Sequence, residues 1–243
     1  FGSDDAADFL KSEFIKSGIP THKSITVQDA QTSQSHIFED KKGERMLAVF
    51  NEDKLINEKT MPTFDFSIGQ SYLVDTNWIE AAHYVAVQSQ KNKLNCVVDL
   101  DNFSNSARLE EVVNLSSHPI FSEIGLNRYT NNKPIIEALK SLYQSNPKFY
   151  AVTLGSKGVY WIDNGDIFHC DSPLVEVKET NGAGDVFHGA FAHFITTKPI
   201  QEAIELATAT ASLKCTMIGG INNLPNSKDV AEFSNQLQPS RKI

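Results

Sequence analysis

The 243-residue sequence has few cysteines and no excess of basic side chains. Cys96, Cys170 and Cys215 are too few and too far apart for a disulfide scaffold, which favours a reducing compartment. The formal net charge of −8 argues against a nucleic-acid-binding protein, which would carry a basic stripe. No apolar run approaches the length of a membrane span, and the acidic N-terminal residues form no signal-peptide pattern. We therefore expect a cytoplasmic protein without nucleic-acid or membrane partners.

Several common catalytic and phosphate-binding motifs are also missing. The sequence contains no G-x-x-x-x-G-K-[ST] loop, no G-x-S-x-G nucleophile motif and no H-E-x-x-H zinc motif. Gly182-Ala183-Gly184 begins a G-x-G, but the next glycine, Gly189, comes too late for the dinucleotide-binding fingerprint. The seven histidines show no paired spacing typical of a metal site. A phosphate site, if present, must therefore be built in another way.

Strand-like and helix-like runs alternate through most of the sequence. From Phe66 onward this alternation predicts a parallel sheet with helices on its faces. Asp163-Asn164-Gly165-Asp166 predicts a hairpin turn between two of the strands. The predicted strands are 71–75, 95–100, 118–121, 149–154, 159–162 and 167–170, with an extended run at 173–178, and the predicted helices are 78–91, 107–115, 132–145, 184–195 and 199–217.

The N-terminal quarter has a different pattern. Ser3 or Asp4 can cap a helix that runs to about Ser17. Three extended pieces follow without a helix between them, at 24–28, 32–39 and 44–50, with a turn at Lys41-Lys42-Gly43. We expect residues 21–59 to form a small antiparallel sheet that projects from a core of residues 1–20 and 60–243. The alternative is an extension of the edge of the main sheet.

One stretch, residues 179–191, predicts an anion site. An extended run passes through the glycine turn Gly182-Ala183-Gly184 into a helix, and a helix N-terminus offers unpaired N–H groups to anions. Asp185 is then placed beside the anion, where a carboxylate suits a base in phosphoryl transfer better than a phosphate ligand. The alternative is that Asp185 is an ordinary residue of a first helical turn.

Polar side chains follow two of the predicted strands. Asp75 and Asn77 come after one strand, and Asp99 and Asp101 lie at the end of the next. Because ligands of open α/β sheets bind at the carboxyl ends of the strands, we expect these residues to line a substrate cleft.

Residues 179–191 resemble the C-terminal signature of the ribokinase-like, or phosphofructokinase B, family of sugar kinases. Residues 153–158 resemble the nucleotide-site segment of that family, and Gly2-Ser3-Asp4-Asp5 resembles the segment that precedes its lid. Ala7-Asp8-Phe9-Leu10 and Lys214-Cys215 are similar to the ketohexokinase and fructokinase branch. The resemblance implies a three-layer α/β/α core with a mainly parallel sheet and a small β lid over the sugar.

The resemblance also implies an ATP-dependent kinase of a small, ketose- or hexose-like sugar that uses Mg²⁺. Asp185 would accept the proton of a sugar hydroxyl, and the N–H groups of Gly182, Ala183 and Gly184 would form the anion hole. Thr153, Gly155, Gly158 and Asn181 would lie on the nucleotide side. The alternatives are a hairpin for residues 155–158 and a turn role for Asn181. The alternatives for the function of the whole protein are a nucleoside kinase or a catalytically silent protein that binds a sugar or nucleotide.

Two positions depart from the family pattern, and one segment is missing. Ser122-Glu123-Ile124-Gly125 stands where many members carry N-x-x-E, whose glutamate organises magnesium. Glu179 replaces the usual aspartate that helps hold a monovalent cation, so K⁺ is expected to stimulate only modestly. The family's first strand and early sugar-binding segment precede anything matching Gly2, and we expect the chain to begin partway into the biological protein. The apolar strands of the lid predict a homodimer joined through the lids.

Overall fold

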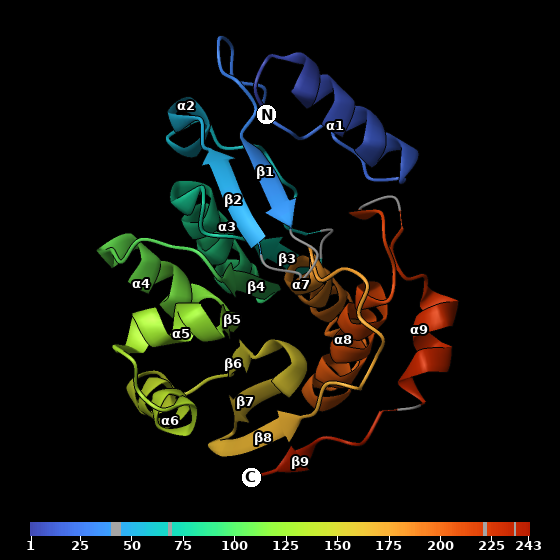
Figure 1. Cartoon of the computed structure of the whole chain (residues 1–243). Helices are drawn as coiled ribbons and strands as arrows, with labels where there is room; N and C mark the ends of the chain where they lie inside the picture. The colour runs from blue at the N-terminus through green and yellow to red at the C-terminus, as the bar shows by residue number, and fades with distance from the viewer. Residues whose placement is uncertain (40–44, 68–69, 221–222, 236) are drawn as a thin grey trace.

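The structure, a computed structural model, describes residues 1–39, 45–67, 70–220, 223–235 and 237–243 (Figure 1). Within them the main sheet has the strand order β3-β4-β5-β6-β7-β8-β9. Strands β3 to β6 are parallel to one another, and each pairing from β6 to β9 is antiparallel. The strands are β3 (Ser71–Val74), β4 (Asn95–Leu100), β5 (His118–Ser122), β6 (Tyr150–Thr153), β7 (Val159–Asp163), β8 (Asp166–Cys170) and β9 (Arg241–Lys242).

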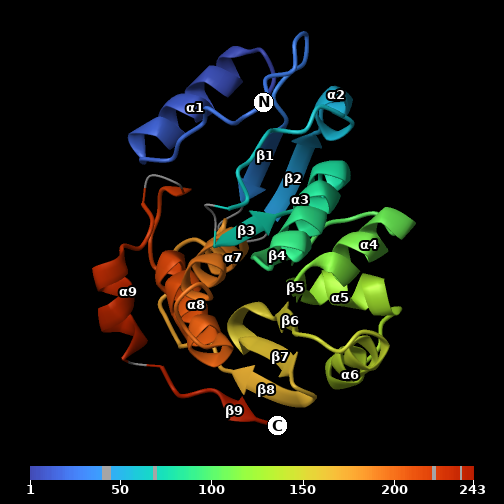
Figure 2. The ribbon, with the colours of Figure 1, turned by 180° about the vertical axis from the view of Figure 1, so that it is seen from behind.

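Helices cover both faces of this sheet, which gives the predicted three layers. One apolar core joins one face of the sheet to α3 (Ile79–Asn92), α4 (Ala107–Leu115), α5 (Glu123–Thr130) and α6 (Ile135–Ser145). A second core joins the opposite face to α7 (Ala183–Phe194) and α8 (Ile200–Cys215). A further helix, α9 (Ser227–Ser234), lies outside α8 in both views (Figures 1 and 2).

The alternation of side chains along β4 assigns its residues to these two cores. Cys96, Val98 and Leu100 belong to the core beneath α3 and α4, whereas Val97 belongs to the core beneath α7 and α8. Successive side chains of a strand point to opposite faces, so Asp99 shares the face of Val97. The Asp99 side chain is thus directed toward α7.

The N-terminal part contributes secondary structure outside the main sheet. Its elements are α1 (Asp5–Lys16), β1 (Gln34–Glu39), β2 (Arg45–Phe50) and the short α2 (Asp53–Ile56). Strands β1 and β2 pair antiparallel in a two-stranded sheet of their own, which lies at the β3 end of the main sheet (Figure 1). Asp4 caps α1 through the Ala7 N–H and also accepts the Thr32 N–H at 2.8 Å, so one carboxylate joins α1 to the chain before β1.

Some sequence-based boundaries were wrong. Residues 24–28 form no strand in the structure, and α6 begins only at Ile135, after the separate helix α5. The extended run at 173–178 pairs with no other strand of the two described sheets. The sequence analysis also missed α2, α9 and β9. The hairpin turn is confirmed, with left-handed φ values of 51° at Asn164 and 84° at Gly165. The predicted turn at Lys41-Lys42-Gly43 lies outside the described residues.

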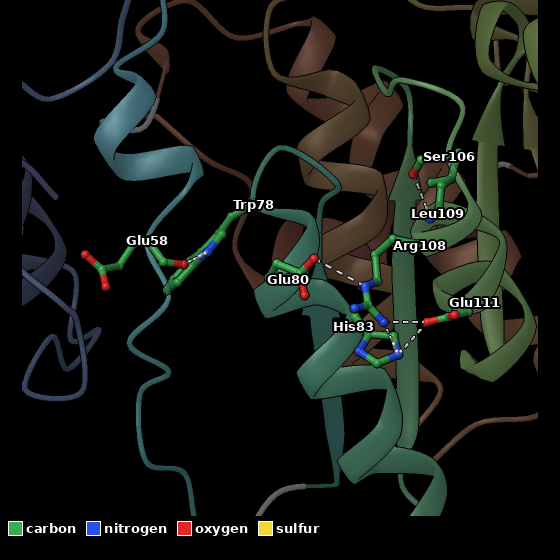
Figure 3. A network of polar contacts seen from close by, with 8 residues as sticks. All are labelled: Glu58, Trp78, Glu80, His83, Ser106, Arg108, Leu109 and Glu111. Carbon is green, nitrogen blue, oxygen red and sulfur yellow. Dashed lines mark hydrogen bonds and ion pairs between the residues drawn. The ribbon is translucent and has the colours of Figure 1, made fainter.

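Polar contacts tie the outer elements together (Figure 3). The Arg108 guanidinium of α4 contacts Glu80 of α3 at 3.2 Å and Glu111 at 2.6 Å. Before α3, the Trp78 indole N–H donates to the Glu58 carbonyl at 2.8 Å. This bond attaches the segment that follows the two-stranded sheet to the loop after β3. Within the described residues, none of the helices combines the length and apolar character needed to cross a bilayer.

Candidate active site

The glycine turn before α7 has the geometry of an anion site. Gly182 is the N-cap of α7 and has a φ of 74°, a left-handed conformation that strongly favours glycine. A Cβ added at Gly184 would have no neighbouring atom within 4 Å, so space remains beside the first helical turn. The Ala183 N–H donates to the Thr180 carbonyl at 3.2 Å, so it already has a partner in this state. The turn therefore offers an open, positively polarised helix start.

Buried aromatic side chains fix the orientation of α7. Phe187 and Phe191 lie in the core, and the Phe191 ring stacks on Phe149 with centroids 5.7 Å apart. At the other side of the turn, the Lys178 N–H donates to the Cys215 carbonyl at 2.8 Å. Packing thus holds the helix, and a backbone bond to the end of α8 holds the segment that leads into it.

Asp185 lies exposed in the first turn of α7, close to a charged group at the end of β4. Burial raises the pKa of Asp99, and the neighbouring charges of Asp185 and Asp101 raise it further, while His188 opposes both effects. The structure therefore brings together three of the predicted site residues, Asp99, Asp101 and Asp185.

His188 connects α7 to Asp99, and the sequence analysis missed it. Its ring is buried, and Nδ1 lies 2.8 Å from the Gly184 carbonyl oxygen and 3.3 Å from Asp99 Oδ2. Because a carbonyl oxygen can only accept, Nδ1 carries the proton and donates it. His188 therefore links the backbone of the glycine turn before α7 to the carboxylate of β4. No local sequence pattern predicts this role, because the contact with Asp99 forms only when the ring is buried against another element.

Asp75 and Asn77 lie at the same edge of the sheet but line a different space. They border a cavity of about 430 Å³ together with Trp78, Lys23 and the N-terminal Phe1, among others. The Thr76 hydroxyl donates to the Asn102 carbonyl at 2.9 Å, which ties the loop after β3 to the loop after β4. The predicted cleft residues thus come from adjacent loops, of which only the first lines this cavity.

The predicted nucleotide residues form a tight turn between β6 and β7. Thr153 ends β6, and the Leu154 N–H donates to the Gly158 carbonyl at 2.8 Å. Gly155 and Gly158 have φ values of 56° and 83°, and a Cβ on Gly158 would lie 2.0 Å from the Cys170 carbonyl oxygen. The turn thus excludes a side chain at Gly158, and its left-handed backbone favours glycine at Gly155. Asn181 lies exposed in the turn before α7.

The segment Ser122–Gly125 cannot accommodate the glutamate of an N-x-x-E motif. Ser122 instead caps α5 by accepting the Gly125 N–H at 2.9 Å. A Cβ on Gly125 would lie 2.0 Å from the Leu100 carbonyl oxygen, so no side chain fits there. Within the described residues, no group of three or more His, Cys, Asp or Glu side chains is arranged to hold a metal ion. The described chain supplies no complete metal cage.

Glu179 does not lie in a site that fits a free monovalent cation. Its Oε2 atom accepts the Gly219 N–H at 3.0 Å and lies 3.8 Å from Nζ of Lys214, whose side chain is buried. A positive charge is therefore already present at this carboxylate. The sequence analysis noted Lys214 only as part of the Lys214-Cys215 resemblance.

At this edge of the sheet, a glycine turn at a helix start lies beside acidic side chains. This arrangement suits a kinase of small molecules, because phosphoryl transfer needs fixed anion-binding groups beside a base. A family model described as pfkB family carbohydrate kinase matches residues 1–227, and the chain belongs to this family. The protein is accordingly an ATP-dependent carbohydrate kinase.

Similar proteins agree with this assignment. The chain is 26% identical over 230 residues to a ribokinase of Dictyostelium discoideum, covering 84% of this chain and 72% of the relative. A crystal structure from Agrobacterium tumefaciens, described provisionally as a ribokinase, has a TM-score of 0.90 and 29% identity, covering 97% and 78% of the two chains. Arabidopsis thaliana ribokinase complexed with ribose and ATP has a TM-score of 0.83 at 20% identity, covering 96% and 80%, and shows the likeness of fold alone. The proximity to the ketohexokinase and fructokinase branch stays a prediction.

Proposed function

We propose that this kinase phosphorylates a hydroxyl group of a ribose-like sugar, with Asp185 as the general base. The observation that carries the proposal is the position of Asp185, in the first turn of α7 directly after the left-handed Gly182. In the reaction, the sugar oxygen attacks the γ-phosphorus of ATP and the bond to the β–γ bridging oxygen breaks, which releases ADP. The hydroxyl proton passes to the Asp185 carboxylate.

The backbone supports the transferred group in this proposal. The N–H groups of Gly182 and Gly184 face the phosphoryl group as it develops charge, and that of Ala183 joins them by exchanging its bond to Thr180. Thr153, Gly155 and Gly158 border the nucleotide from the turn between β6 and β7, and Asn181 does so from the turn before α7. Preorganised donors of this kind need little rearrangement during the reaction.

The sugar would extend from the cavity at the end of β3 toward the first turn of α7, so that its reactive hydroxyl group reaches Asp185. Asp75 and Asn77 offer it polar side chains, and Trp78 offers an aromatic face. Asp99 and Asp101 would bind hydroxyl groups on the side that faces Asp185. Ribose is our first choice because a curated relative that matches most of the chain is named a ribokinase, and a ketose or hexose is the alternative.

Magnesium would be bound mainly by the phosphates of ATP. The absence of a side chain at Gly125 leaves no glutamate to organise it there. Mg²⁺ commonly keeps several waters and takes one or two protein carboxylates besides substrate phosphates.

A substrate panel tests the proposed function directly. The full chain is assayed for ADP release with Mg·ATP and, in turn, ribose, deoxyribose, fructose, glucose and nucleosides. The proposal predicts the highest kcat/KM for ribose, and Asp75→Ala should raise the KM for the sugar while leaving the KM for ATP nearly unchanged. A preference for fructose would favour the ketose reading. Phosphorylation of nucleosides alone, or of no acceptor, would overturn the proposal.

We also propose that two copies associate through the two-stranded sheet. One face of it carries Phe38, Met46 and Phe50, which are 56%, 65% and 44% exposed. The opposite face carries Ile37 and Val49, and the side chain of Leu47 lies outside what the structure describes. Met46→Lys should convert a dimer into a monomer in light scattering, whereas Phe9→Lys, on the exposed side of α1, should not. A parent protein that is monomeric at all concentrations would contradict this proposal.

A further inference from the structure

Lys214 is a buried charge whose role the proposed reaction does not explain. It lies in the last turn of α8 with only 1% of its surface exposed. Its Nζ atom has no hydrogen-bond partner among the described residues. Burying an ammonium group is costly unless an opposite charge compensates it. The chain must therefore gain something at this position that a hydrophobic side chain would not provide.

The surroundings of this ammonium are negatively polarised. Glu179 Oε2 lies 3.8 Å from Nζ. The carbonyl end of α8 lies there too, and its Cys215 carbonyl accepts the N–H groups of Lys178 and Glu179 at 2.8 and 3.2 Å. A helix C-terminus carries partial negative charge, so it and the carboxylate repel each other, and a cation close to the carboxylate reduces this repulsion. Lys214 supplies that cation from within the chain.

The carboxylate also joins the anion-binding turn to the loop after α8. Glu179 stands three residues before Gly182, and its Oε2 atom accepts the Gly219 N–H at 3.0 Å. Interactions that hold the Glu179 side chain in place therefore also hold the backbone at the start of the turn. A free cation at the same carboxylate would meet the ammonium at close range in a largely buried place, where like charges repel strongly.

We infer that Lys214 is a positioning residue whose ammonium replaces a dissociable monovalent cation at Glu179, so that this kinase works without K⁺. The inference rests on the proposed function, because Glu179 matters through the turn that holds the phosphoryl group. It sharpens the sequence-based expectation of modest stimulation by K⁺ into independence from K⁺.

The parent protein gives the first test. Turnover is measured at constant ionic strength in tetramethylammonium, Na⁺ or K⁺ chloride, and the melting temperature is measured in the same salts. The inference predicts rates that agree within about two-fold and equal melting temperatures. A requirement for K⁺, or a melting temperature that rises with K⁺ in a saturable way, would overturn it. Because melting needs no substrate, an inactive parent would count against the proposed function and leave this readout intact.

Two substitutions give the second test. Lys214→Met keeps much of the volume and removes the charge, and it should lower turnover about 10- to 100-fold, as the loss of a supporting residue does in other sites. Lys214→Ala also leaves space, and K⁺ or NH₄⁺ should restore part of its rate and raise its melting temperature. Lys228→Met serves as the control, because it removes an exposed lysine 3.9 Å from Glu232 on α9.

The outcome of these variants is decisive in either direction. Full activity of Lys214→Met in tetramethylammonium chloride would overturn the inference. So would a folded Lys214→Ala protein that is inactive and indifferent to every monovalent cation. If neither variant folds, the salt dependence of the parent protein still tests the inference, because a site that binds a free cation would respond to it.

Discussion

At the scale of single residues, His188 and Asp99 form a pair beside the glycine turn that begins α7. The His188 ring touches the Gly184 carbonyl and the Asp99 carboxylate through one nitrogen. Asp99 has a raised pKa because it is buried and has two acidic neighbours, and His188 counteracts this. The ionised form of Asp99 thus depends on a residue that does not itself reach the cleft surface.

Substitution of His188 should therefore change the pH dependence of the reaction. His188→Phe keeps a buried ring and removes the group that lowers the pKa of Asp99. If Asp99 works as a carboxylate, the acid limb of the kcat/KM profile should move to higher pH, because a nearby positive charge favours the ionised carboxylate and is lost. His193→Phe, on the exposed side of the same helix, serves as the control. Identical profiles for His188→Phe and the parent would refute the role given to this pair.

The residues that the sequence analysis identified share a local signature. Gly182 to Asp185 are contiguous, and a glycine turn before a helix start is visible in one stretch of sequence. The side chains of His188 and Lys214 contact residues of other elements in the folded protein. No spacing of residues in the sequence predicts such contacts. Site residues can thus be predicted from sequence where they are close together in the chain. Residues that meet only through folding, as buried side chains, are found from the structure.

At the scale of elements, caps set several of the helix starts. Ser106 caps α4 by accepting the Leu109 N–H at 3.1 Å, and Ser122 caps α5 in the same way. Strand 95–100 and helix 107–115 have the bounds that the sequence pattern predicted. Residues 24–28 have a strand-like composition, but they belong to neither of the sheets that the described strands form. Pairing is a long-range property, so composition alone misled the assignment.

The cap of α4 gives a prediction about stability. Ser106→Ala should lower the free energy of unfolding by about 1 kcal/mol, because the Leu109 N–H loses its acceptor. Ser106→Gly should cost only a few tenths of a kcal/mol, since glycine is also tolerated at an N-cap. Urea denaturation of the three proteins measures this order. Equal stability of the alanine variant and the parent would show that the cap contributes nothing.

At the scale of the whole molecule, the two cores pack against opposite faces of the main sheet. His118 lies in the core beneath α7, with its ring 5.2 Å from Phe149 and 5.5 Å from Phe191. Burial lowers the pKa of His118 from 6.5 to about 4, and the charge of Lys148 adds to this effect. The folded protein thus keeps this ring neutral at a pH where the unfolded chain binds a proton.

The fold should therefore lose stability on mild acidification. A lowered pKa in the folded state favours folding fully above pH 6.5, and this contribution is lost as the pH falls toward 4. Unfolding by urea should show a loss of up to about 1.4 kcal/mol per pH unit in this range from this one group. His118→Asn should flatten the pH dependence, and the exposed His193→Asn should not. An unchanged slope in His118→Asn would contradict the assignment.

The central claim is that Asp185 acts as the base at the anion-binding turn, and one comparison tests it most directly. Turnover of Asp185→Asn is measured beside its ATP affinity by calorimetry, with Asp229→Asn, in the first turn of α9, as the matched control. The account predicts that turnover falls about 10²- to 10⁴-fold, the usual contribution of a positioned base, while ATP affinity and the melting temperature change little. A folded Asp185→Asn protein that turns over within a few-fold of the parent would contradict the account.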